Sequence, residues 1–315
     1  MKKMGLAFGV LLAATASSVR AEDVVTLAIG QKGAFENNVA PLGQEKGFFK
    51  KHGIELKIFY TQGSGETIQA VISGSADIGV SAGTLGTVGA FAKGAPVRII
   101  GATIHGANDL YWYVKPDSPI KSMRDTAGKT VSYSTAGSST NTAVLAFRDY
   151  FKVDLKPTAT GGPQSSYTQT LTGQVDVGWS GGSILLEQMD EGKARVIARA
   201  SEVPQLQNQT PRVLVSNVQT VEKRREVLQR FMAAYRETRE WIYSDPAAIE
   251  AFAKWAEIPV KVANQVRTSI YPKQDLDPDK IIGMDLIMED VVKFKYATAA
   301  LTKEQISQLF LVPFK

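Results

Sequence analysis

Short apolar runs alternate with segments of helical spacing along the first two thirds of the chain. The runs that predict strands cover residues 24–29, 54–60, 77–81, 97–103, 110–114, 130–134, 175–179, 195–198 and 212–215. The segments that predict helices between them cover residues 39–51, 67–72, 85–92, 141–151, 167–171 and 184–191. Such alternation is typical of an α/β fold with largely parallel sheets.

The pattern changes after Val218, where only helical spacing remains. The helices expected there cover residues 221–243, 246–256, 260–270, 280–294 and 303–309. Asp245-Pro246 opens one of them, since proline is well tolerated in the first helical turn, and Pro259 interrupts the next. We therefore expect two α/β stretches followed by a helical tail.

A short segment recurs 99 residues further along the chain without a gap. The first copy, ISGSADIGVS, ends at Ser81, and the second, LTGQVDVGWS, ends at Ser180. Each copy reads as a helix end, a glycine, a turn aspartate and a strand; either chance or two similar lobes explains it. Ligands of open α/β sheets bind outside the carboxyl ends of the strands. Two facing lobes would therefore place Ser81 and Ser180 on opposite walls of one cleft.

The first residues have the pattern of a secretory signal peptide. Residues 1–3 are Met-Lys-Lys, residues 4–16 are apolar and small, and residues 19–21 read Val-Arg-Ala, so we expect cleavage after Ala21. The apolar run is shorter than the roughly 20 residues that cross a bilayer, and we expect no membrane insertion. The chain has no cysteine to carry a lipid anchor. These features predict a free periplasmic protein.

Composition excludes several kinds of site. The chain has no cysteine and two histidines, His52 and His105, which excludes disulfides, thiolate metal sites and a histidine-rich metal centre. Hydrophobic residues make up 44% and charged residues 21%, as in an ordinary globular protein. Loss of Lys2, Lys3 and Arg20 with the signal peptide lowers the formal net charge from +5 to +2. So small a charge supplies no field for nucleic acid or a membrane.

Enzyme motifs are incomplete. Ser118 and Lys121 have the spacing of a serine–lysine hydrolase, but Pro116 and Pro119 lie where that chemistry needs a helix. The segment around Lys129 lacks the glycine of a phosphate loop, and there is no Gly-x-Ser-x-Gly motif. We therefore expect a protein that is not an enzyme and holds no cofactor or metal, with an exported enzyme as the less favoured alternative.

Several motifs, taken in order, resemble those of one receptor family. They are Gln31-Lys32-Gly33 after the first strand, PLGQEKGFFKKHGIEL at 41–56, SGSADIG at 73–79, SPIKS at 118–122 followed by GKTV at 128–131, and GSSTN at 137–141. The chain resembles the periplasmic substrate-binding proteins of nitrate, sulfonate and taurine ABC transporters. That resemblance implies a type II periplasmic fold, with two lobes, two hinge crossings and closure around a ligand. It also implies an ABC permease and its ATPase as partners.

The resemblance sets the expected boundaries and ligand. Residues 1–21 are the signal peptide, residues 22–105 and 212–315 form the first lobe, and residues 106–211 form the second, in a monomer. The segment after Trp179 reads SGGS, smaller and more neutral than in the sulfonate receptors, which leaves room for a larger ligand. We expect a small organic anion of the sulfonate, taurine or aromatic carboxylate type. A neutral heterocycle such as a thiamine-pathway pyrimidine is the alternative.

The candidate ligand-binding residues come from strand ends and from the loops that open helices. In the first lobe they are Gln31, Lys32, Phe35, Ser81, Gly83, Thr84 and His105. In the second lobe they are Ser134, Gly137, Ser138, Ser139, Thr140, Trp179 and Ser180. Hydroxyls and free N–H groups at a helix start favour an anion, although the same serines also serve as helix caps. Lysine adds a cation, and the aromatic rings are expected to cover or stack on the ligand.

Overall fold

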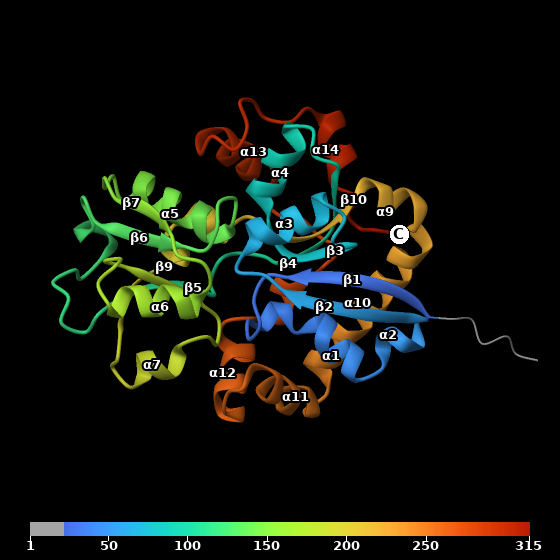
Figure 1. The fold of residues 1–315 in the computed structure, drawn as a ribbon, viewed down its shortest axis with the longest axis horizontal. Coiled ribbons are helices and arrows are strands. Elements are labelled where there is room, and N and C mark those ends of the chain that lie inside the picture. The colour runs from blue at the N-terminus through green and yellow to red at the C-terminus, as the bar shows by residue number, and fades with distance from the viewer. Residues whose placement is uncertain (1–21) are drawn as a thin grey trace, which may run out of the picture.

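The computed structural model describes residues 22–315, so the expected signal peptide lies outside the described part of the chain. Two lobes lie side by side, each built on its own sheet (Figure 1). We call the elements around the five-stranded sheet lobe 1 and those around β5 to β9 lobe 2. The α/β architecture expected from the alternating pattern is confirmed, but the sheets are mixed rather than largely parallel, because one strand in each lobe pairs antiparallel with its neighbours.

The sheet of lobe 1 has the order β2-β1-β3-β10-β4. Its strands are β1 (Asp23–Ile29), β2 (Ile54–Tyr60), β3 (Ile78–Gly83), β4 (Val97–Ile104) and β10 (Arg212–Asn217). The first three run parallel, whereas β10 returns from lobe 2 and pairs antiparallel with both β3 and β4. β3 is buried along its whole length, as expected for an inner strand covered by helices on both faces.

Lobe 2 repeats this strand order. Its strands are β5 (Leu110–Val114), β6 (Thr130–Tyr133), β7 (Lys156–Ala159), β8 (Gly178–Gly181) and β9 (Arg195–Arg199). They form the sheets β8-β5-β9 and β6-β7, which a bridge between Val131 and Val177 connects. Across that bridge the order is β7-β6-β8-β5-β9, in which β5 occupies the place that β10 has in lobe 1. Each lobe therefore receives one strand that runs antiparallel to its neighbours.

The repeated aspartates have the same role in both lobes. Asp77 Oδ2 accepts a hydrogen bond from the backbone N–H of Thr26 in β1, over 2.9 Å. Asp176 Oδ2 accepts one from the backbone N–H of Thr130 in β6, also over 2.9 Å. Since β1 and β6 hold equivalent places in the two sheets, the segment repeated in the sequence corresponds to a structural repeat.

Helices surround both sheets. Those before β10 are α1 (Val39–Glu45), α2 (Phe48–Lys51), α3 (Ser64–Ile72), α4 (Thr84–Ala92), α5 (Ser139–Tyr150), α6 (Pro163–Leu171), α7 (Leu186–Asp190) and α8 (Pro204–Gln207). Those after it are α9 (Val218–Lys223), α10 (Arg225–Ser244), α11 (Ala247–Ala256), α12 (Val260–Ser269), α13 (Met284–Lys293) and α14 (Lys303–Leu309). Short 3-10 helices cover Phe35–Asn37, Met123–Asp125, Ala200–Glu202 and Lys273–Leu276.

Three expectations about elements need correction. The helix expected at 39–51 is divided into α1 and α2, because Gly47 between them has a φ of 83°. The helix expected at 221–243 is likewise divided, at Arg224. Strand β7 was not predicted, because its sequence KPTA is short and polar; it lies at an edge, where proline is tolerated.

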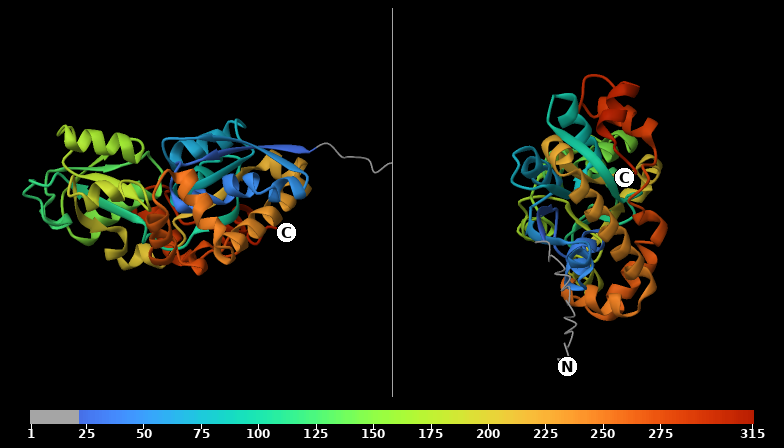
Figure 2. Two further views of the ribbon diagram at one scale, coloured as in Figure 1. Left: turned by 90° about the horizontal axis from the view of Figure 1, so that it is seen from below. Right: turned by 90° about the vertical axis from the view of Figure 1, so that its right-hand side faces the viewer.

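The helical tail expected after Val218 covers both faces of the lobe 1 sheet. α10 turns an apolar stripe inward, including Leu228, Phe231 and Tyr235, into the same core as α1 and β1. Ile287 and Val291 of α13 pack with α3 and α4 on the opposite face. Figure 2 shows these late segments, orange to red, wrapped around lobe 1. Between residues 22 and 315, no helix combines the length and the apolar character needed to span a bilayer.

Candidate ligand-binding site

A small cavity with about 20 Å³ of free space lies between the lobes at the carboxyl ends of several strands. Lobe 1 and the returning strand β10 line it with Gly30, Gln31, Glu36, Asn37, Ser64, Ser81 and Arg212. Lobe 2 lines it with Leu110, Ser134, Ser139, Thr140 and Trp179. Strand ends of both sheets therefore converge on one enclosed space, as the rule for open α/β sheets predicts.

The start of helix α5 supplies the hydroxyls of the lobe 2 wall. Ser138 is the N-cap, and its Oγ accepts a hydrogen bond from the N–H of Asn141 over 3.0 Å. The Thr140 hydroxyl accepts from the backbone N–H of Ser134 and lies 3.0 Å from the Ser134 hydroxyl. Because the helix dipole places partial positive charge here, this wall favours an anion or a hydrogen-bond acceptor.

The lobe 1 wall contains a buried charge cluster. Arg212, at the start of β10, is 5% exposed and lies 2.7 Å from Glu36 Oε1 and 2.5 Å from Asp109 Oδ1. Burial raises the pKa of Glu36, although the positive charge of Arg212 opposes that shift. The Tyr271 hydroxyl donates to Asp109 Oδ2 over 3.3 Å. One guanidinium therefore pairs with a carboxylate from each lobe, while its buried Nε–H has no hydrogen-bond partner among the described residues.

Trp179 forms an apolar part of the lobe 2 wall. Its side chain is nearly fully buried, and its indole N–H donates to the carbonyl of Gly161 over 3.2 Å. On the lobe 1 wall, the Ser81 hydroxyl donates to Asn37 Oδ1. Asn37 in turn donates through Nδ2 to the carbonyl of Gln31 over 2.9 Å. The cavity thus combines one aromatic wall with walls of ordered polar groups.

The structure brings only part of the expected set to this cavity. Those that line it are Gln31, Ser81, Ser134, Ser139, Thr140 and Trp179. Contact of these residues with a ligand remains a prediction. Thr84 and Ser138 are buried beside the cavity, where Thr84 N–H donates to the Pro211 carbonyl and Ser138 caps its helix. Gly83 and Gly137 instead form a contact between the lobes.

Lys32, Phe35 and His105 lie away from the cavity. Lys32 is half exposed and forms an ion pair with Glu257 over 2.6 Å. Phe35 is fully buried in the core of lobe 1, where its ring stacks on Tyr271 at a centroid distance of 5.1 Å. His105 follows β4 at the crossing, and its Nδ1 lies 3.0 Å from the Thr210 hydroxyl. An ion pair, core packing and a hinge contact account for these three side chains.

Ser180 also lies outside the cavity, although its partner in the repeat, Ser81, lines it. Ser180 pairs regularly with Tyr111 of β5, and its hydroxyl donates to the Ile184 carbonyl over 2.8 Å. Ser81 sits at an irregularity in the pairing of β3 with β10 and has a φ of 60°. This bulge turns the end of β3, so equivalent positions in the sequence do not have equivalent side-chain directions.

Sequence reasoning missed four polar residues of the cavity: Glu36, Asn37, Ser64 and Arg212. One signal for Arg212 was present, since an arginine opens an otherwise apolar strand that returns from the second lobe. A buried arginine requires carboxylate partners, and those lie far away in the sequence. Glu36 and Asn37 follow the first strand in the same loop as Lys32 and Phe35. The local pattern of that loop does not encode which of these side chains turns toward the cavity.

The lobes are closed over the cavity. A Cβ atom added at Gly86 would lie 2.2 Å from the carbonyl oxygen of Gly137, and one at Gly83 would lie 2.3 Å from the same oxygen. Across the same contact, the N–H of Gly65 donates to the Thr135 hydroxyl over 3.0 Å. Backbone therefore packs on backbone between α4 and the loop before α5. A side chain at either position would hold the lobes apart.

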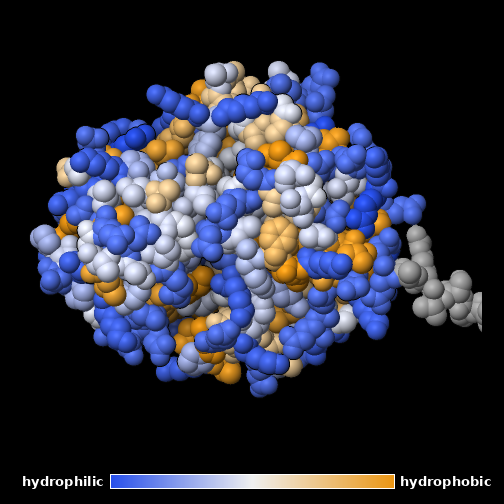
Figure 3. Space-filling view, viewed as in Figure 1, coloured by the Kyte–Doolittle hydropathy of each residue, from blue (hydrophilic) through white to orange (hydrophobic). Residues whose placement is uncertain are grey.

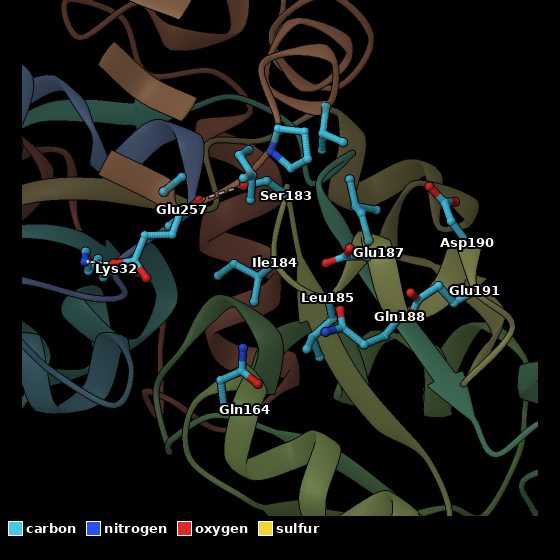
Figure 4. A pocket seen from close by; sticks show the side chains of 16 residues that line it. Lys32, Gln164, Ser183, Ile184, Leu185, Glu187, Gln188, Asp190, Glu191 and Glu257 are labelled. Carbon is cyan, nitrogen blue, oxygen red and sulfur yellow. Dashed lines mark hydrogen bonds and ion pairs between the residues drawn. The ribbon is translucent and has the colours of Figure 1, made fainter. Parts of the chain in front are cut away.

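A wider cleft opens outside the cavity, between α7 and the turn from α11 to α12. Figure 3 shows a hollow between the lower halves of the lobes, with hydrophobic residues in it and hydrophilic residues around it. In Figure 4, Lys32 and Glu257 are paired on one side of this cleft, and Glu187, Asp190 and Glu191 lie on the other. The acidic groups outnumber the single lysine, so this cleft is unfavourable for anions.

No cluster of three or more histidine, aspartate or glutamate side chains within residues 22–315 has the arrangement of a metal site. The carboxylates nearest the cavity, Glu36 and Asp109, are both bound to Arg212. These residues do not fit a metal ion.

Asp290 of α13 connects the lobes through two amides of lobe 2. Gln205 donates to its Oδ1, and Gln209 donates to its Oδ2 over 2.9 Å. Burial raises the pKa of Asp290 to about 6, while hydrogen bonding from Gln209 and the charge of Lys293 oppose this shift; Glu289 and Asp149 add to it. The folded protein therefore favours the protonated acid more than the unfolded chain does.

We expect this carboxyl to make the protein less stable as the pH rises from about 4 to 7. The folded pKa of Asp290 exceeds the unfolded value, so its contribution is full near pH 4 and is lost as the pH passes about 6. Relative to Asp290→Asn, the wild-type free energy of unfolding should fall by up to about 3 kcal/mol across this range. Urea unfolding at several pH values measures this difference. Asp117→Asn, at an exposed carboxyl, is the control, and a flat difference for Asp290→Asn would refute the assignment.

Two sheets of equal strand order, joined by exchanged strands and facing each other across a cavity, define the periplasmic binding protein fold. The model of the NMT1/THI5-like family matches residues 38–249. The chain belongs to this family.

Solved structures of receptors share this fold. The alkanesulfonate-binding protein SsuA from Xanthomonas axonopodis pv. citri, bound to MOPS, matches with a TM-score of 0.73 at 17% identity, over 92% of this chain and 99% of that chain. The aliphatic sulphonate-binding protein SsuA from Escherichia coli matches with a TM-score of 0.65 at 20% identity, over 90% and 91%. The nitrate-binding protein NrtA from Synechocystis PCC 6803 matches with a TM-score of 0.70 at 12% identity, over 92% and 86%. No curated protein matches the chain by sequence.

Proposed function

We propose that the chain is a periplasmic solute receptor that captures a small organic ligand between its lobes. The closed, liganded form docks on the permease of an ABC importer, whose ATPase powers uptake, and the receptor itself performs no chemistry. The observation that carries this proposal is the enclosed cavity at facing strand ends, with polar groups from both lobes. Solved receptors with the same fold bind sulfonates and nitrate, as their names state.

The ligand has a sulfonate, carboxylate or similar acceptor group at the start of α5. Ser134, Ser139 and Thr140 present hydroxyls there, at the positive end of the helix dipole. In this closed form the cavity has about 20 Å³ of free space, which admits no polymer. Closure expels water from these groups, and the ligand shifts the population toward the closed form.

A neutral heterocycle such as a thiamine-pathway pyrimidine is the second candidate. It is favoured by the buried ring of Trp179, on which a flat ligand can stack, and by the two carboxylates that offset the charge of Arg212. Both features suit a ligand without full negative charge.

A thermal-shift panel on residues 22–315 tests the receptor function. Sulfonates, aromatic carboxylates and aminopyrimidines are the probes, and at 100 times its Kd a bound probe should raise Tm by roughly 5–10 °C. Ser139→Leu should abolish the shift, because leucine would fill the cavity. Ser75→Leu, at an exposed loop position, is the matched control. A panel without any shift, together with native mass spectra that show no copurified small molecule, would reject the proposal.

A further inference from the structure

Glu36 offers the cavity an oxygen that no described residue uses. The side chain lines the cavity and is 1% exposed. Its Oε1 accepts from Arg212 over 2.7 Å, whereas Oε2 makes no hydrogen bond within residues 22–315. The Tyr271 hydroxyl lies beside both carboxylates: its hydrogen bonding opposes the rise in the pKa of Glu36, and it donates to Asp109 Oδ2 over 3.3 Å. Buried carboxylate oxygens are almost always hydrogen-bonded, so a free one beside a cavity indicates a missing donor.

The net charge of the cluster also favours a hydrogen-bond donor on the ligand. Arg212 is the one cation among Glu36, Asp109 and Arg212, so the ionised cluster has a formal charge of −1. A full anion placed directly against this cluster would be repelled in a medium of low dielectric constant. An N–H group, neutral or cationic, would instead complete the hydrogen bonding of Glu36.

The lobe 2 wall of the cavity favours a hydrogen-bond acceptor on the ligand instead. Ser134, Ser139 and Thr140 lie at the amino-terminal end of α5, a helix of twelve residues. The dipole of that helix favours an acceptor. The cavity therefore has two polar ends of opposite preference, and Trp179 lines the space that both ends share.

We infer that the ligand carries an N–H donor that Glu36 Oε2 accepts, and at its other end an acceptor or anionic group directed at the start of α5. This inference rests on the proposed receptor function and names the ligand class within it: an aminated acid, or an aminated heterocycle with a ring acceptor. Glu36 is the residue that selects for the donor.

Calorimetry with matched ligand pairs tests the inference on residues 22–315. The pairs are taurine and ethanesulfonate, 4-aminobenzoate and benzoate, and 4-amino-2-methylpyrimidine and 2,4-dimethylpyrimidine. In the pair that binds, the aminated member should bind about 10- to 100-fold more tightly, as expected for a hydrogen bond to a buried charged group. In Glu36→Gln, the amide can present N–H in place of the free oxygen, so the preference should shrink to less than about 3-fold or reverse. Glu257→Gln, at the exposed carboxylate of the outer cleft, should keep the full preference.

The outcomes separate the inference from the proposed function. Equal or tighter binding of the member without the amine overturns the inference and leaves the receptor function intact. Binding by no member of any pair rejects both, since the pairs cover every ligand class proposed. An unchanged preference in folded Glu36→Gln overturns the role of Glu36. If circular dichroism shows that Glu36→Gln is unfolded, the wild-type affinities for the two members of each pair test the inference on their own.

Discussion

Gly86→Ala should weaken ligand binding by about 10- to 100-fold while leaving the unliganded protein as stable as wild type or slightly more stable. The new Cβ would lie 2.2 Å from the Gly137 carbonyl oxygen and 2.8 Å from its carbonyl carbon. The backbone atoms of this packed loop cannot move far enough to relieve the overlap without a cost in free energy. Overpacking typically costs about 1–3 kcal/mol. The clash exists only when the lobes meet. Within α4, alanine is the better helix former by up to about 1 kcal/mol.

Calorimetry with the probe that gives the largest thermal shift measures the affinity, and small-angle scattering measures closure. Wild type should become more compact on addition of the probe, whereas Gly86→Ala should not. Gln69→Ala, an exposed position on α3, is the matched control and should behave as wild type. Full affinity and full compaction in Gly86→Ala would show that these lobes do not close through the contact between Gly86 and Gly137.

Arg212→Met should lower the free energy of unfolding by about 3–5 kcal/mol, which corresponds to a fall in Tm of roughly 10 °C. Methionine keeps much of the length of the side chain and removes its charge. Glu36 and Asp109 would then lie buried near each other without a cation. The loss comes from uncompensated burial of charge, so adding Glu36→Gln and Asp109→Asn to the variant should restore much of the stability.

Urea unfolding of the single and triple variants checks this explanation. Arg236→Met is the control, because its ion pair with Asp279 is about one third exposed, and it should cost less than about 1 kcal/mol. A triple variant as unstable as Arg212→Met would mean that packing of the arginine side chain, rather than its charge, stabilises the cluster.

The sequence predicted most of the strands and the class of fold, because buried strands of a two-lobed α/β protein are apolar runs with little ambiguity. It failed at β7, whose polar residues at a sheet edge carry no apolar signal. The repeat ending at Ser81 and Ser180 correctly indicated two equivalent lobes, since the turn aspartates that cap β1 and β6 are local features.

The site was less predictable for reasons of geometry. The hydroxyls at the start of α5 lie on a segment between a strand and a helix, so their position can be predicted from the local sequence. Ser134, Ser139 and Thr140 do line the cavity. The cluster of Arg212 with Glu36 and Asp109 joins positions 176 and 103 residues apart, which no local pattern encodes. The bulge that turns Ser81 inward depends on the pairing of β3 with β10, so the direction of that side chain could not be read from its own segment.

The return of β10 from lobe 2 determines when the sheet of lobe 1 can be completed. In lobe 1, β10 separates β3 from β4, so residues 22–105 alone leave an open slot in the middle of their sheet. The slot is filled only by residues 212–217, after the whole of lobe 2 has left the ribosome. Residues 22–105 therefore cannot complete the sheet of lobe 1 while the rest of the chain is being synthesised. For a protein proposed to cross a membrane before it functions, we expect that delay to favour export of the unfolded chain.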